Sequence, residues 1–111
     1  MAECPNGLSA IEAAVQATPD VCLLEVHMPG VSGIEATLRI GQQLPIAGVV
    51  VMTASPNELG LAEAIRAGAH GYVDKWLETP RLAGTLRVVF SGQTAFPRAL
   101  VRRALGHELA H

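Results

Sequence analysis

Three side chains of complementary chemistry stand at the ends of three short apolar runs. Glu25 closes the first run, Thr53 closes the second and Lys75 follows the third. In an open parallel sheet the functional crevice lies outside the carboxyl ends of the strands, and neighbouring strands are about 4.8 Å apart. A carboxylate, a hydroxyl and an ammonium group can therefore converge on one small pocket. The alternative is that each of these residues is simply a polar side chain at the point where its strand reaches solvent.

A second candidate for chemistry is the motif HELAH at residues 107–111. In zinc metallopeptidases two His side chains one helical turn apart bind Zn²⁺ and the Glu between them activates water. His107, Glu108 and His111 would take these roles in a zinc hydrolase, which is the alternative from a different class. The sequence offers no stretch after the motif for a third ligand, so we interpret HELAH as a chance match.

The runs that would position the three strand-end residues alternate with helical patterns. Residues 21–26, 49–53 and 71–74 are short and mainly apolar, which is typical of strands covered on both faces of a parallel sheet. Helix starts are predicted by capping residues and by proline, at Ser9 with Glu12, Ser32 with Glu35, Asn57, Thr79 with Pro80, and Pro97. Short strands that alternate with helices predict βαβ units and an α/β fold.

The composition fits one globular domain. The chain has 111 residues, of which 50% are hydrophobic and 16% are charged, with a net charge of -2. These values exclude a disordered tail and give no indication of a nucleic-acid or membrane-surface binder. Cys4 and Cys22 lack CxxC spacing, so we expect two reduced thiols in a cytoplasmic protein. No apolar stretch approaches the roughly 20 residues needed to cross a bilayer.

The order of the motifs resembles the receiver domains of bacterial two-component response regulators. The segment "PDVCLLEVHMPGVSGIEA" is similar to the family's phosphorylation site, in which an apolar run is followed by Asp, two residues, Met-Pro and Gly. "VVVMTAS" resembles the family's hydroxyl strand, "AGAHGYVDK" its aromatic-and-lysine strand, and "GQTAFPRALVRRAL" the connector that precedes a helix-turn-helix of the LuxR or NarL type. The resemblance covers roughly residues 3–105. It implies a flavodoxin-like three-layer sandwich with a parallel sheet.

The resemblance also assigns roles to seven residues around the strand ends. They are the phosphoacceptor position Glu25, the phosphoryl-pocket residues Thr53 and Lys75, the switch aromatic Tyr72, and the loop residues His27, Met28 and Pro29. In the family the switch ring turns inward when the site is occupied. We expect none of these residues to be catalytic, and we do not expect the chain to be an enzyme.

Two departures from the family pattern bear on function. The family acceptor is an aspartate, whereas the extra methylene of Glu25 carries the carboxylate outward by about 1.5 Å. A misplacement of about 1 Å can already cost about a hundredfold in rate. The longer carboxylate could also imitate the phosphorylated state by drawing Thr53 and Lys75 inward. The adjacent acids that hold Mg²⁺ in the family have no counterpart, because no two acidic residues are adjacent; Mg²⁺ binding is expected to be weak or absent, with no metal site and no cofactor.

The sequence begins where the second strand of the family would close. The usual first strand and first helix are then expected to be missing, which would leave residues 21–26 with an unpaired edge that invites another chain. We predict a truncated receiver-like domain over residues 1–92 and a connector helix over residues 93–111, with the DNA-binding domain absent. A homodimer or a strand-exchanged oligomer is expected.

These features predict an atypical, phosphorylation-independent receiver that acts as a signalling or dimerisation module related to transcriptional regulators. The expected partners are a second copy and a sensor kinase or another signalling protein. Neither a membrane nor direct nucleic-acid binding is expected. The alternative within the family is a genuine phosphoacceptor with a misassigned start, in which an acidic pair would be encoded upstream.

Overall fold

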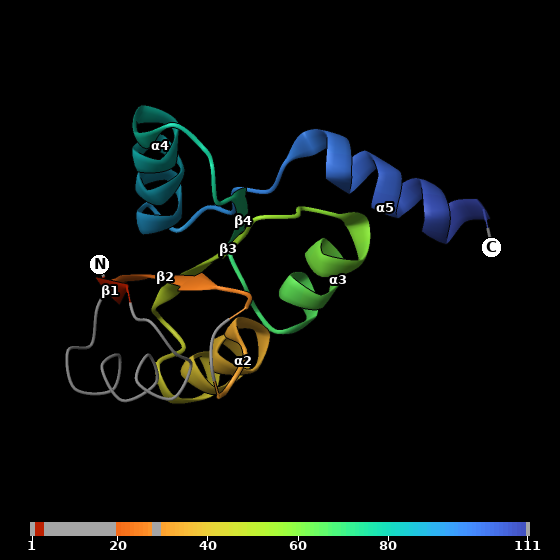
Figure 1. Cartoon of the computed structure of the whole chain (residues 1–111). Helices are drawn as coiled ribbons and strands as arrows, with labels where there is room; N and C mark the ends of the chain where they lie inside the picture. The colour runs from red at the N-terminus through yellow and green to blue at the C-terminus, as the bar shows by residue number, and fades with distance from the viewer. Residues whose placement is uncertain (1, 4–19, 28–29, 111) are drawn as a thin grey trace.

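A parallel sheet forms the centre of the chain (Figure 1). The computed structural model describes residues 2–3, 20–27 and 30–110. The described strands form a four-stranded sheet in the order β1-β2-β3-β4. Their bounds are Ala2–Glu3 for β1, Val21–Glu25 for β2, Gly48–Thr53 for β3 and Gly71–Asp74 for β4.

The two longest strands are buried because side chains pack on both of their faces. Four of the five residues of β2 and all six residues of β3 are buried. Continuous apolar runs suit such strands, whereas a strand with one solvated face alternates apolar and polar residues. The strands predicted at 21–26, 49–53 and 71–74 are confirmed to within one residue at each end.

Helices cover the two faces of the sheet. Their bounds are Gly33–Gln43 for α2, Glu58–Arg66 for α3, Thr79–Phe90 for α4 and Arg98–Ala110 for α5. Figure 1 shows α2 and α3 on one side of the sheet and α4 on the other. The predicted α/β, flavodoxin-like three-layer arrangement is therefore confirmed. Within the described part of the chain, no helix has the length and apolar character needed to cross a membrane.

The core has two parts, one on each face of the sheet. Alternation along the strands sends neighbouring side chains to opposite faces. The part below α2 and α3 contains Cys22, Leu24, Val49, Val51, Leu61 and Tyr72, and it also receives Leu100 of α5. The part below α4 contains Val21, Leu23, Val50, Met52, Val73 and Val89.

Two predicted helix starts are confirmed by their capping bonds. The Ser32 hydroxyl accepts a hydrogen bond from the backbone N–H of Glu35 at 3.2 Å, and the Asn57 side chain accepts one from Gly60 at 2.8 Å. The Glu35 carboxylate turns away from the cap, because its Oε1 accepts from Arg39 Nε at 3.0 Å. Among the described contacts, the capping box of α2 therefore has the bond from the Glu35 N–H to the Ser32 hydroxyl but lacks the reciprocal bond from the Ser32 N–H to the Glu35 carboxylate.

The predicted cap of α4 was wrong. Glu78 is the N-cap, without a capping bond from its side chain, and Thr79 and Pro80 are already helical. The first N–H groups of a helix have no partner within the helix, so a proline there loses no bond. Thr79 thus enters the helix without acting as its cap.

The prediction of an unpaired edge on β2 was wrong for part of that strand. Ala2 pairs with Cys22 and Glu3 with Leu23 in parallel register. Two extended residues are enough to supply main-chain partners to the first half of β2. The predicted helix start at Ser9 and Glu12 and the side chain of Cys4 lie outside the described residues.

The segment after α4 returns along the edge of β4. Ala95 donates its N–H to His70 O at 2.8 Å and accepts at its carbonyl from Tyr72 N–H at 3.3 Å. Helix α5 then packs on α3 (Figure 1). The division of the chain at residue 92 stays a prediction.

Candidate functional site

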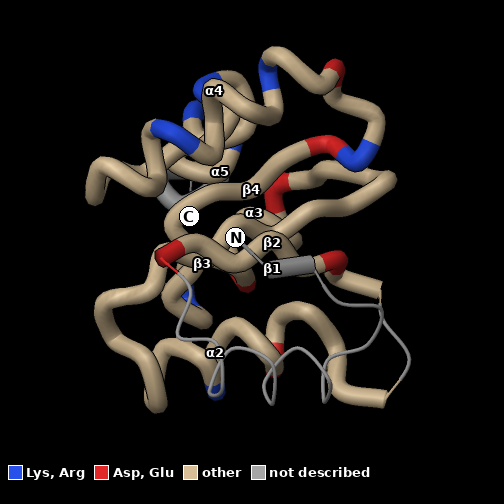
Figure 2. The backbone as a smooth tube through the Cα atoms, turned by 90° about the vertical axis from the view of Figure 1, so that its left-hand side faces the viewer, with Lys and Arg blue, Asp and Glu red and all other residues tan. Residues whose placement is uncertain are grey.

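The ends of β2, β3 and β4 bring the predicted pocket residues to one edge of the sheet. The main-chain ladder continues past the strands, since Val26 N–H donates to Met52 O at 2.9 Å and Lys75 N–H donates to Thr53 O at 2.8 Å. These bonds fix the backbone from which the side chains project. In Figure 2 acidic and basic positions meet where β2 and β4 end.

Glu25 and Lys75 form an ion pair across the sheet edge. Lys75 Nζ lies 3.3 Å from Glu25 Oε1 and 3.4 Å from Oε2. The Lys75 side chain is 39% exposed and that of Glu25 is 34% exposed. Water screens a pair of this kind, so it contributes about 0–1 kcal/mol to stability. Its importance is positional, because the ammonium group is held at the acidic residue.

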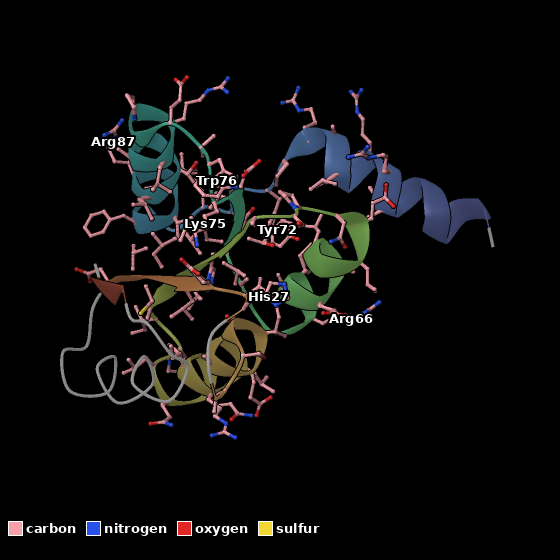
Figure 3. The ribbon with its side chains drawn as sticks, in the orientation of Figure 1. His27, Arg66, Tyr72, Lys75, Trp76 and Arg87 are labelled. Atoms are coloured by element: carbon pink, nitrogen blue, oxygen red, sulfur yellow. The ribbon has the colours of Figure 1, made fainter. Side chains whose placement is uncertain are left out.

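Lys75 has a second neighbour in Trp76. The Lys75 Nζ lies 5.8 Å from the centroid of the Trp76 ring, within the range of a cation–π attraction. Trp76 is 75% exposed. Figure 3 shows both side chains beyond the end of that strand.

The beginning of α2 packs closely behind Glu25. Gly33 N–H donates to Val26 O at 3.0 Å, and a Cβ atom at Gly33 would overlap the main-chain carbonyl of Glu25. Only glycine permits this approach. Together with the Ser32 cap, it fixes the backbone of Glu25 against the first turn of α2.

Thr53 is close to this edge, but its hydroxyl is used locally. The side chain is buried, and its Oγ1 accepts a hydrogen bond from Ser55 N–H at 3.2 Å. Among the described contacts, Lys75 is drawn to Glu25 and the Thr53 hydroxyl is not. Whether Glu25 imitates the phosphorylated state stays a prediction.

Tyr72 lies with its ring inside the protein, between the sheet and α3 (Figure 3). It is 1% exposed, and its hydroxyl oxygen accepts from Asn57 N–H at 3.3 Å. A Cβ atom at Gly60 would overlap the same hydroxyl, so the ring fills the space under the first turn of α3. The inward position is the one that the resemblance associates with an occupied site.

A pocket of about 190 Å³ with a mixed lining, of which Val26, Ile34 and Leu59 are apolar, lies between Thr53 and α3. Tyr72 and His27 also line it, together with Ser55, Asn57 and Glu63. His27 is exposed at the rim, whereas the loop residues Met28 and Pro29 lie outside the described residues. The pocket links the Thr53 end of the site to the Tyr72 ring.

The described acidic side chains at this edge of the sheet have other partners. Mg²⁺ binds through oxygen ligands, commonly one or two carboxylates together with waters. In the described ranges no group of three or more His, Cys, Asp or Glu side chains is placed to hold a metal ion. The Glu25 carboxylate already has an ammonium neighbour, and Asp74 Oδ1 accepts from Trp76 N–H at 2.8 Å.

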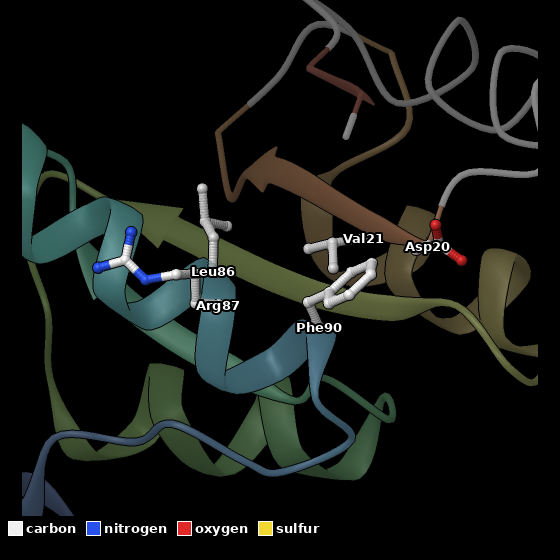
Figure 4. A pocket seen from close by; sticks show the side chains of 5 residues that line it. All are labelled: Asp20, Val21, Leu86, Arg87 and Phe90. Carbon is white, nitrogen blue, oxygen red and sulfur yellow. The ribbon is translucent and has the colours of Figure 1, made fainter.

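A second, apolar pocket of about 210 Å³ lies between β2 and α4 (Figure 4). Val21, Leu86 and Phe90 form its apolar lining, with Asp20 and Arg87 at its rim. Phe90 is 66% exposed. This surface is separate from the pocket at the strand ends.

Sequence reasoning missed the role of His70. Its Nδ1 accepts a hydrogen bond from Val49 N–H at 3.1 Å, while its own main-chain N–H donates to Val49 O at 2.7 Å. His70 therefore joins β3 to the start of β4 with both its side chain and its backbone. Its position directly before an apolar strand was the available signal, but it does not specify this bond.

The sequence matches the response regulator receiver domain over residues 1–87. One curated relative, the uncharacterized transcriptional regulatory protein YxjL of Bacillus subtilis (strain 168), is 38% identical over 94 residues, which cover 85% of this chain and 43% of YxjL. The nitrate/nitrite response regulator protein NarL of Escherichia coli (strain K12) is 32% identical over 98 residues, covering 88% of this chain and 45% of NarL. The chain thus spans less than half the length of either relative. These matches give no support to a zinc hydrolase.

Solved structures agree with the sequence matches. A two-component response regulator of the LuxR family from Aurantimonas sp. SI85-9A1 superposes with a TM-score of 0.86 at 26% identity, covering 98% of this chain and 78% of that chain. The signal receiver domain of the putative response regulator NarL from Mycobacterium tuberculosis gives a TM-score of 0.75 at 25% identity, covering 79% and 71% of the two chains. The chain therefore belongs to the response regulator receiver domain family, with relatives of the NarL and LuxR type.

Proposed function

We propose that the chain is a phosphorylation-independent receiver that serves as a signalling and dimerisation module of a cytoplasmic response regulator related to transcriptional regulators. The observation that carries this proposal is the ion pair of 3.3 Å between Glu25 and Lys75. Glu25 stands where the resemblance places a phosphoacceptor aspartate. Lys75 stands where the resemblance places a ligand of the phosphoryl oxygens.

The length of the acidic side chain supports this reading. The extra methylene extends the carboxylate by about 1.5 Å, and the carboxylate reaches the ammonium group directly. A phosphoryl donor would have to separate this pair and approach a carboxylate without a described cation site beside it. The repulsion between two anionic groups then remains uncompensated, which disfavours phosphoryl transfer.

Incubation with acetyl phosphate and Mg²⁺, followed by intact-mass measurement, tests the proposal. Glu25→Gln is the matched control, because it keeps the size of the side chain and removes the charge. We expect no added phosphoryl group on the unmodified chain and the same result for the control. A phosphoryl adduct that disappears in Glu25→Gln would contradict the proposal and favour the genuine phosphoacceptor.

The proposed partners are a second copy of this chain and a sensor kinase or another signalling protein. The apolar pocket between β2 and α4 supports the second copy. Phe90, which lines this pocket, is 66% exposed. The rim carries one acidic residue, Asp20, and one basic residue, Arg87. A symmetric pair of chains could therefore bury Phe90 and place Asp20 of one copy against Arg87 of the other.

Light scattering across a concentration series tests self-association through this surface. We expect a dimer for the unmodified chain and a mass closer to the monomer for Phe90→Glu. Leu59→Glu is the control, since Leu59 is also 66% exposed but lies on α3, on the opposite side of the sheet from α4 (Figure 1). A monomer at every concentration, or equal weakening by both substitutions, would contradict the assignment of this surface.

A further inference from the structure

The outer edge of β4 is paired along its first half by the segment that follows α4. Ala95 N–H donates to His70 O at 2.8 Å, and Tyr72 N–H donates to Ala95 O at 3.3 Å. These two bonds make a parallel bridge between Ala95 and Gly71. The chain therefore supplies one residue of a further strand, in the same direction as β4.

This added strand stops because the next pairing position is a proline. Tyr72 N–H points outward to Ala95, and main-chain groups two residues further along a strand point the same way, so those of Asp74 also point outward. In a parallel ladder the residue two beyond Ala95 would donate to Tyr72 O and accept from Asp74 N–H. That residue is Pro97, which has no N–H, and α5 begins directly after it. Among the described contacts, Tyr72 O and Asp74 N–H have no partner on this side.

A cavity of about 440 Å³ lies beside this open half of the edge. Its lining comes from both faces of the sheet. Val73, Leu77 and Thr85 lie on the side of α4, whereas Pro56 and Leu100 lie on the side of α3 and α5. Figure 1 shows β4 between α4 and α5. A cavity lined from both faces of a sheet lies at the edge of that sheet, in the place where the added strand would continue.

We propose that the open half of the β4 edge binds an extended peptide segment as a parallel strand that continues from Ala95. A single peptide residue carries an N–H and a C=O at the spacing needed to bond Tyr72 O and Asp74 N–H, as Ala95 does one step earlier. Unpaired groups at a sheet edge are a template for such pairing. Peptides recognised in this way gain affinity from main-chain bonds and specificity from pockets for alternate side chains.

The pairing register assigns the side chain of that peptide residue to the α4 side of the sheet. The residue would lie opposite Val73, whose side chain packs towards α4, and paired residues share a face. Leu77 and Thr85 form the rest of the wall there. The Thr85 hydroxyl already donates to Arg81 O at 3.2 Å, so the wall offers an apolar surface. The expected ligand is therefore an extended peptide with an aliphatic side chain at the bonded residue.

Peptide binding at this edge goes beyond the proposed function, because neither Glu25 nor the surface around Phe90 takes part in it. A phosphoryl adduct on Glu25 would overturn the proposed function and leave the β4 edge unchanged. Conversely, failure of peptide binding would leave the labelling and light-scattering results unaffected. The two proposals can therefore fail separately.

An NMR titration of the isotope-labelled whole chain with acetyl-Val-Ser-amide tests the site. The valine of this probe would bond Tyr72 O and Asp74 N–H. We expect the Asp74 amide signal to shift with a dissociation constant of about 1 mM, since two hydrogen bonds and one side chain carry the binding. Methylation of the valine nitrogen removes the donor and should weaken binding about tenfold or more. Methylation of the serine nitrogen, which would face away from the edge, should change binding by less than about twofold.

Thr85→Phe and Val88→Phe are the matched pair of protein variants. Both residues lie on α4, but Thr85 lines the cavity and Val88 does not; Val88 is 37% exposed. A ring at position 85 would fill the space for the peptide side chain. We therefore expect Thr85→Phe to weaken binding about tenfold or more and Val88→Phe to bind like the unmodified chain. If Thr85→Phe does not fold, the two methylated peptides decide the question on the unmodified chain.

Three results would overturn the proposal. One is an Asp74 amide that does not shift in a titration well above the expected dissociation constant. Another is equal binding of the two methylated peptides or equal binding by the two variants, which would mean that no strand is added at this edge. The third is a shift of the Asp74 amide with protein concentration alone, which would identify a second copy of the chain as the occupant.

Discussion

Replacing Gly60 with alanine tests the inward position of Tyr72 directly. Alanine normally stabilises a helix relative to glycine, by at most about 1 kcal/mol. At Gly60, however, the new Cβ would overlap the Tyr72 hydroxyl and come within 3.3 Å of the ring carbon Cζ. Gly60→Ala should therefore lower the free energy of unfolding, whereas the same change elsewhere in a helix raises it. The cause is the hydroxyl oxygen of Tyr72 in β4, which the new Cβ would overlap.

The magnitude follows from the space available. Forcing an extra methyl group into filled space costs about 1–3 kcal/mol, which exceeds the gain in helix propensity. Removing the hydroxyl as Tyr72→Phe loses the bond from Asn57 N–H, at a cost of about 0.5–1.5 kcal/mol, but it opens room for the methyl group. In the Phe background we expect Gly60→Ala to be neutral or slightly stabilising. The coupling energy between the two sites should then be about 1–3 kcal/mol.

Urea unfolding of the four chains of this double-mutant cycle measures the coupling. Gly84→Ala is the matched control, because it lies within α4 and its new Cβ would meet nothing closer than Arg87 Nη2 at 3.8 Å. We expect Gly84→Ala to stabilise the chain and Gly60→Ala to destabilise it. If Gly60→Ala were as stabilising as Gly84→Ala with Tyr72 intact, the ring would not lie beneath α3.

Three further predictions can be tested in the same unfolding assay. Gly33→Ala should cost about 3 kcal/mol or more, because its Cβ meets the main chain of Glu25, which cannot rotate away; a cost below that of Gly60→Ala would contradict this packing. His70→Ala should cost about 1–3 kcal/mol by depriving Val49 N–H of its acceptor, whereas His27→Ala, at an exposed position, should change stability by less than about 0.5 kcal/mol. Lys75→Met combined with Glu25→Gln should show a coupling of at most about 1 kcal/mol, since the pair is partly exposed; a larger value would mean that water is excluded from it.

The strands and most helix starts could be predicted because they depend on neighbouring residues. Unbroken apolar runs predicted β2 and β3, and Ser32 and Asn57 were recognisable as caps. The meeting of Glu25 and Lys75 was predictable as well, because parallel strands end at one edge of a sheet. Fifty residues separate these two side chains, so the topology of the sheet was needed to bring them together.

Contacts set by side-chain geometry could not be predicted. The overlap between Gly60 and the Tyr72 hydroxyl depends on how closely α3 approaches β4. The bond from Val49 N–H to His70 depends on the direction of one imidazole ring, and the pairing of β1 depends on a register that two residues cannot specify. The start of α4 was misplaced as well, because the helix begins one residue earlier than the Thr79-Pro80 pattern indicated, with Glu78 as its N-cap.

A crystal structure obtained in the presence of beryllium fluoride and Mg²⁺ tests the central claim most directly. Beryllium fluoride binds to the acceptor carboxylate of a competent receiver in the place of a phosphoryl group. We predict that Glu25 carries no adduct and that Lys75 Nζ remains at its carboxylate, near the present 3.3 Å. A beryllium fluoride group bonded to Glu25, with Mg²⁺ beside it and Lys75 turned to the fluorides, would contradict the proposal that this receiver works without phosphorylation.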